Sequence, residues 1–117
     1  MSKQYNLKMK AGVHYRLRLR WYNANGTPKV LTNVDAKMTL KSSYASPVEL
    51  ITLTLNNGIY ITPAEGLIEI VITDEQTKSI SKPRDTMGVY DLKVIMSDGF
   101  TDRLIGGTWK MTPAVTD

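Results

Sequence analysis

Hydrophobic and polar residues alternate along much of this chain, and the alternation is strictest over residues 13–22. Odd positions in this stretch are apolar, whereas the even positions hold His14, Arg16, Arg18 and Arg20. Successive side chains of a β-strand point to opposite sides, so the pattern predicts a strand with one buried and one exposed face. We expect this strand to organise the core through Val13, Tyr15, Leu17, Leu19 and Trp21.

The same period of two, or a dense run of β-branched residues, predicts the other strands. They are expected at residues 5–10, 34–42, 48–55, 59–61, 67–72, 89–97 and 100–112, with a brief edge strand at residues 30–31. Residues 67–72 are expected to form a central strand. Both Leu50 and Ile51 are apolar, so either register of the 48–55 strand is open.

Turn and helix signals separate these strands. Thr73 and Gln76 match a capping box, which predicts a short helix ending near Ile80. Gly106 and Gly107 fall inside the last strand and predict a bulge or the close approach of another backbone. Tight turns are expected at the pairs that tolerate positive φ, namely residues 25–26, 57–58 and 98–99.

This pattern predicts an all-β fold, an antiparallel immunoglobulin-like β-sandwich with one short helix. We expect one domain over residues 1–117, because that length can bury a core without metals or disulfides. The predicted core consists of Tyr15, Leu17, Leu19, Trp21, Met38, Leu40, Ile70, Tyr90, Leu92 and Trp109.

Composition excludes several classes of protein. Hydrophobic residues make up 42% of the chain and charged residues 22%, which is typical of a globular protein. The chain has no cysteine, which removes disulfides, thiolate zinc sites and cysteine nucleophiles. Neither a signal peptide nor a run of roughly 18 apolar residues is present, so we expect a soluble protein with no membrane partner. The net charge of +4 permits an anionic partner but is too small to indicate nucleic acid.

Catalytic chemistry is not indicated by the sequence. The chain has one histidine, and its carboxylates are scattered singly. A catalytic site needs a tuned acid, base or nucleophile in a pocket. His14 is expected to be a solvated residue on an exposed strand face, because a lone histidine does not make a metal site. We expect no enzymatic activity, no cofactor and no metal.

The basic face of residues 13–22 is the feature that suggests a function. Its arginines stand about 7 Å apart, and like charges at that spacing repel unless anions lie opposite them. The face could dock an acidic protein, or bind nucleic acid, although Tyr15 and Trp21 point to the other side, where they cannot stack on bases. It could also be a solvated face whose arginines pair with Glu49, Glu69 or Asp91.

Sheet edges offer a second way to bind a partner, because their unpaired backbone groups can accept a strand from a neighbour. The expected edges are the 5–10 strand and the segment near Val30, where lysine and proline residues would protect the free protein. The predicted partner-binding residues are therefore Arg16, Arg18, Arg20, Lys8 and Lys10.

Turn and core segments follow one another in a characteristic order from about residue 4 to residue 116. They are YNL at 5–7, YRLRLRW at 15–21, NGTP at 25–28, LTNVDAKM at 31–38, NGI at 57–59, GLIEI at 66–70, GVYDL at 88–92, DG at 98–99 and RLIGGTW at 103–109. In this order the chain resembles small immunoglobulin-like virion structural proteins of tailed bacteriophages, which are similar to the N-terminal domain of baseplate upper proteins.

The resemblance implies a non-enzymatic virion structural protein that is made in the host cytoplasm and assembled in many copies. Its implied partners are other phage virion proteins of the tail, fibre or capsid. A tail-associated adaptor or fibre-anchoring component is the leading expectation, and a capsid decoration (cement) protein is the alternative. A nucleic-acid-binding module is an alternative of another class.

Overall fold

The structure is a computed structural model that describes residues 3–113. Strands make up most of the described chain, together with one short helix and one 3-10 turn. In chain order the elements are β1 (Lys3–Gln4), β2 (Leu7–Lys10), β3 (Tyr15–Arg20), β4 (Asp35–Lys41), β5 (Ile51–Leu55), β6 (Gly58–Thr62), η1 (Pro63–Glu65), β7 (Leu67–Ile72), α1 (Asp74–Ser79), β8 (Thr86–Ile95) and β9 (Thr101–Thr112).

The nine described strands form one mixed sheet in the order β1-β9-β8-β4-β5-β6-β7-β3, and β2 pairs with β9 beyond β1. The all-β class is confirmed. The pairing is not wholly antiparallel as predicted, because β1 and β2 run parallel to β9, and β5 runs parallel to β6. The first strands join the last strand of the chain instead of forming a hairpin with β3, and local alternation carries no information about such distant pairing.

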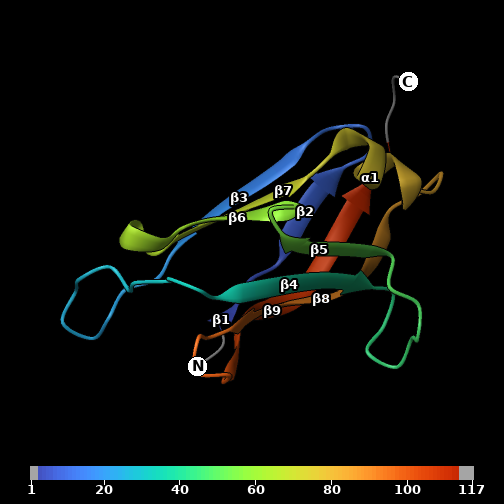
Figure 1. Ribbon diagram of the computed structural model, residues 1–117. Helices are drawn as coiled ribbons and strands as arrows, with labels where there is room; N and C mark the ends of the chain where they lie inside the picture. The colour runs from blue at the N-terminus through green and yellow to red at the C-terminus, as the bar shows by residue number, and fades with distance from the viewer. Residues whose placement is uncertain (1–2, 114–117) are drawn as a thin grey trace.

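The sheet folds over so that β3, β7 and β6 lie across from β4, β8 and β9, as Figure 1 shows. Side chains from both layers form one buried cluster between them. Strand β7, which is rich in β-branched residues, contributes the fully buried Ile68, Ile70 and Ile72. It lies between β6 and β3 as a central strand. The predicted central position of residues 67–72 is therefore confirmed.

Strand β3 differs from its prediction. Six of the ten expected core residues are buried, namely Met38, Leu40, Ile70, Tyr90, Leu92 and Trp109. The four from the arginine-rich stretch are only partly buried, and Val13 is 53% exposed and lies outside the strand. The reason is position: β3 ends the strand order and pairs with β7 alone, so no second strand covers its flank. Residues 15–20 form an edge of the sheet.

Most other elements lie close to their predicted bounds, except that the single strand expected at residues 5–10 is replaced by β1 and β2, which are separated at residues 5 and 6. The capping box is present, because Thr73 accepts from the Gln76 N–H while the Gln76 side chain accepts from the Thr73 N–H. Strand β5 begins at Ile51, which is buried, and this settles the open register with Leu50 facing outward. The expected strand at residues 30–31 is wrong: Leu31 is buried, but the segment forms no strand.

The glycine pair in β9 allows two backbones to approach closely. A Cβ on Gly107 would lie 2.6 Å from the carbonyl oxygen of Tyr5, and the Tyr90 hydroxyl donates a hydrogen bond to that same oxygen. The bulge itself lies nearby, where the register between β8 and β9 shifts at Leu92 and Lys93. Of the two predicted roles for this pair, close approach is confirmed.

The joint between β1 and β2 is held against β9 by this arrangement. The Tyr5 N–H donates to the Gly106 carbonyl at 3.0 Å, and the Asn6 side-chain oxygen accepts from the Thr108 hydroxyl at 3.0 Å. These bonds replace ladder pairing at residues 5 and 6, so the first edge of the sheet is interrupted after β1.

Candidate interaction surfaces

The three arginines of β3 lie on the outer face of the layer formed by β3, β7 and β6. Arg18 stands opposite Glu69, and its Nε lies 3.5 Å from Glu69 Oε2. Both side chains are well exposed, so this ion pair contributes little to stability. Arg16 and Arg20 stand opposite Val71 and Leu67. Among residues 3–113, neither of these two arginines forms an ion pair.

The expected pairing with carboxylates is thus found at one arginine only. Glu49 lies just before β5 and Asp91 lies on β8, which places both on the other layer, away from β3. The arginine face therefore keeps two cationic groups that are not neutralised by the described residues.

Lys8 and Lys10 lie on a different strand from the arginines. They are the exposed residues of β2, where Lys8 neighbours Lys110 and Lys10 neighbours Thr112 of β9. Lys110 is itself neutralised by Asp85, with an Nζ–Oδ2 distance of 3.3 Å. Strands β2 and β3 are consecutive in the chain, but no ladder joins them within the described residues. We call this unpaired side of the sheet the β2–β3 flank.

Tyrosine side chains fill one end of the β2–β3 flank. Burial and the neighbouring phenol of Tyr5 raise the pKa of Tyr15 to about 12. Burial, followed by the phenols of Tyr15 and Tyr5, also raises the pKa of Tyr90. The Tyr15 and Tyr90 phenols stay neutral at physiological pH, and their contacts with Tyr5 connect β3 with the segment between β1 and β2, where ladder pairing is lacking.

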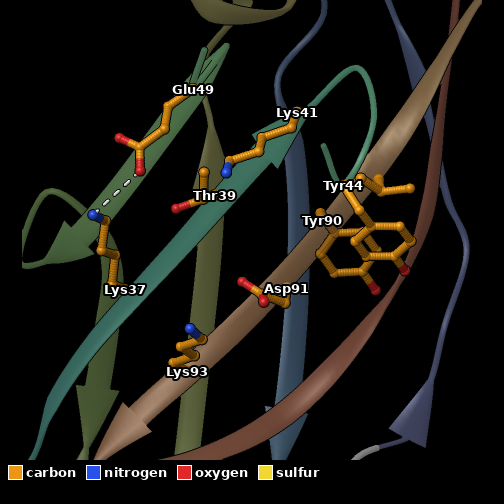
Figure 2. A pocket seen from close by; sticks show the side chains of 9 residues that line it. Lys37, Thr39, Lys41, Tyr44, Glu49, Tyr90, Asp91 and Lys93 are labelled. Carbon is orange, nitrogen blue, oxygen red and sulfur yellow. Dashed lines mark ion pairs between the residues drawn. The ribbon is translucent and has the colours of Figure 1, made fainter. Parts of the chain in front are cut away.

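A second surface, which sequence reasoning did not find, is a shallow cavity of about 290 Å³ over the outer face of β4 and β8. Figure 2 shows its lining side chains, which come from both strands and from residues 42–50 before β5. The Lys37 ammonium lies 3.3 Å from Glu49, and this contact holds the pKa of the Glu49 carboxyl below its ordinary value. The cavity is lined by Lys37, Thr39, Lys41, Tyr44, Glu49, Val89, Tyr90, Asp91 and Lys93.

Two of the lysines that line this cavity continue into a row of three cations that ends outside it, at Arg103. Lys37 of β4 is the direct neighbour of Lys93 of β8, and Lys93 is the direct neighbour of Arg103 of β9. Like charges at directly opposed positions of a sheet destabilise it, and Glu49 beside Lys37 relieves part of this repulsion. Each residue is recognisable in the sequence as an exposed strand position, but the row exists only through the pairing of three strands.

Potential metal ligands do not cluster in the described part of the chain. Across residues 3–113 no group of three or more histidine, aspartate or glutamate side chains is arranged to hold a metal. No helix in the same range is long and apolar enough to cross a membrane. His14 is exposed as expected, and its Nδ1 accepts a hydrogen bond of 3.1 Å from the Asp74 N–H of α1. The groups on offer are ammonium, guanidinium, carboxylate and hydroxyl groups at the surface, which suit reversible binding.

Comparison with known proteins leaves the family open. No protein-family model matches this chain, and no curated protein is significantly similar to it in sequence.

Proposed function

We propose that this chain is a non-enzymatic virion structural protein of a tailed bacteriophage, and that it acts as a tail-associated adaptor or fibre-anchoring component. The ordered turn and core segments described above support the class of protein. The observation that carries the docking role is the arginine face of β3, on an edge strand where Arg16 and Arg20 have no carboxylate partner among the described residues.

The strand order supports the immunoglobulin-like part of this proposal. In this proposal, β3, β7 and β6 correspond to the B, E and D strands of such a sandwich, and β9, β8, β4 and β5 correspond to G, F, C and C′. Helix α1 lies in the connection from β7 to β8. On this assignment, the two layers are joined where β5 of one layer pairs with β6 of the other in a short parallel ladder.

The decisive experiment is quantitative gel analysis of purified particles from the phage that encodes this chain. A tail adaptor is expected in about six or twelve copies, following the symmetry of a tail, whereas a decoration protein is expected in copies on the order of hundreds. The second result would favour the capsid alternative. Absence of the chain from intact particles would reject the virion role altogether.

A charge-reversal experiment tests the docking surface. The variant Arg16→Glu, Arg18→Glu, Arg20→Glu is expected to fold but to incorporate poorly into particles, and high salt is expected to weaken attachment of the wild type. Normal incorporation of a folded variant would show that the arginine face of β3 is only a solvated surface. Attachment would then have to use loops such as residues 42–47 or 81–88.

One observation favours a nucleic-acid-binding module as a second candidate function. Tyr44 is 70% exposed and lines the same cavity as Lys37, Lys41 and Lys93, so an aromatic ring and cations share a face there. This candidate predicts retention on DNA that falls steeply with added salt. Retention of that kind, combined with absence from particles, would replace the virion proposal.

A further inference from the structure

The two edges of the sheet differ in how well they are protected. On one edge, β1 and β2 are two and four residues long and are separated by the joint at residues 5 and 6. On the other edge, β3 runs for six residues without a proline, glycine or bulge. Short, interrupted edges resist the addition of a foreign strand, whereas a long continuous edge invites it.

Both ends of β3 are fixed, and its middle is open. The Thr77 hydroxyl of α1 donates to the Val13 carbonyl at 3.1 Å and accepts from the Gly12 N–H, also at 3.1 Å. Beyond the other end, the Trp21 carbonyl accepts from the Lys29 N–H at 2.8 Å. Between these points, β7 is the one strand of the described chain that pairs with β3, so the backbone groups on the opposite edge have no ladder partner.

The side chains of β3 define what could pair with this edge. Leu17 and Leu19 face the core but are only partly buried, so apolar side chains on an added strand would cover them. The arginines alternate with them on the outer face, where carboxylates on the same added strand would stand opposite.

We propose that the free edge of β3 accepts an extended strand from an acidic partner protein, in which acidic and apolar residues alternate. This inference deepens the docking role proposed above and rests on it for the origin of the partner in the same particle. Backbone hydrogen bonds would provide affinity, and the arginines would select the charge and register of the strand.

A second copy of this chain is a poor occupant of the edge. Pairing β3 with β3 would set arginines against arginines along the whole ladder, and like charges directly opposite each other destabilise a sheet. Nucleic acid lacks the peptide groups that would extend the ladder. Both parallel and antiparallel partners already occur in this sheet, so neither strand direction is excluded for the incoming chain.

The test uses the folded chain and a synthetic capped peptide, Glu-Val-Glu-Val-Glu-Val-Glu, titrated by nuclear magnetic resonance and amide hydrogen exchange. We expect slower exchange at alternate β3 amides, those that do not bond to β7. The same peptide with N-methyl groups throughout should bind much more weakly and leave these amides unprotected, because it cannot donate to the β3 carbonyl oxygens and its methyl groups keep its carbonyls away from the β3 N–H groups. A peptide of identical composition with its glutamates and valines in two blocks should bind more weakly.

Charge-swap variants make the test specific for the edge. The variant Arg16→Glu, Arg18→Glu, Arg20→Glu should bind the acidic peptide about tenfold more weakly and should instead bind Lys-Val-Lys-Val-Lys-Val-Lys. The matched control Lys37→Glu, Lys93→Glu, Arg103→Glu changes the net charge equally on the other layer and should keep wild-type binding. Should the first variant fail to fold, the comparison of normal and N-methylated peptides on the wild type still decides.

Three results would overturn the inference: no binding at millimolar peptide, equal binding of the N-methylated peptide, or equal loss of binding in the control variant. Absence of binding would show that β3 is not a docking edge. Equal binding of the N-methylated peptide would show that only charge attraction holds the peptide. Equal loss in the control variant would show that the peptide binds the other layer. None of these results affects whether the chain is present in particles. Conversely, absence from particles would reject the proposed function while leaving strand capture by β3 standing.

Discussion

Replacing Gly88 by alanine is the sharpest test of how the two layers fit together. Gly88 of β8 pairs with Trp109 of β9, whose buried indole N–H donates a 3.0 Å hydrogen bond to the Lys41 carbonyl. A methyl group on Gly88 would lie 2.2 Å from that carbonyl oxygen and 2.5 Å from the indole nitrogen. The added methyl therefore forces apart the two atoms that make the bond.

The expected cost has two parts. Loss of the bond leaves a buried indole N–H without a partner, at about 1 to 3 kcal/mol. Overpacking of a filled core adds about 1 to 3 kcal/mol. The free energy of unfolding should therefore fall by about 2 to 6 kcal/mol, a large share of the roughly 5 to 15 kcal/mol that holds a domain folded.

Urea unfolding followed by circular dichroism measures this change. The matched control is Gly106→Ala, on the outer face of β9, where the new methyl would meet the flexible Arg103 guanidinium at 3.1 and 3.2 Å and the Tyr90 carbonyl oxygen at 3.3 Å. The control should lose less than about 1 kcal/mol, because the arginine can move aside and the carbonyl contact needs only a small backbone shift. Equal losses in the two variants would refute the packing described around Trp109.

Three further predictions concern particular side chains. Ile70→Ala should reduce the free energy of unfolding by about 2 to 5 kcal/mol, because Ile70 is fully buried. Leu19→Ala should reduce it by less than about 2 kcal/mol, because Leu19 lies on the flank and is only partly buried. Denaturant titration measures both changes, and equal losses would show that the assigned exposure is wrong. The pKa of the Glu49 carboxyl, followed by its nuclear magnetic resonance signal, should lie below its ordinary value and should rise in Lys37→Ala. The stabilisation from this ion pair is present above the ordinary carboxyl pKa and is lost as pH falls through the lowered pKa of Glu49. Because burial raises the pKa of Tyr15 to about 12, its contribution to stability is retained below the ordinary tyrosine pKa near 10 and is lost as pH rises toward 12. The free energy of unfolding of Tyr15→Phe should therefore depend less on pH in the alkaline range than that of the wild type.

The sequence predicts the strands of this fold better than their neighbours. Alternation places β3, β4 and β8 close to their observed bounds, because each strand has one face turned from water. The same alternation made β3 look like the centre of the core. How deeply that face is buried depends on the strands beside it, and β3 has one neighbour where β7 has two. Edge and centre are decided by contacts between distant parts of the chain.

The candidate sites show the same limit. The arginines could be found in the sequence because three residues of one strand suffice to define them. The row of Lys37, Lys93 and Arg103 could not, since it requires the pairing and register of β4, β8 and β9. The carboxylate opposite Arg18 was one of three candidates, and only the pairing of β3 with β7 identifies it as Glu69.

The parallel pairing of the first and last strands has a mechanical consequence. Lys3 pairs beside Ile105, and Lys10 pairs beside Thr112, so the described chain begins at one end of the β9 ladder and ends at the other (Figure 1). Tension applied at Lys3 and Pro113 would pull these strands in opposite directions along their length. The evenly spaced ladder bonds would then be loaded in shear, all at once, instead of opening one after another. Such a domain can transmit a pulling force along β9 while its core stays closed.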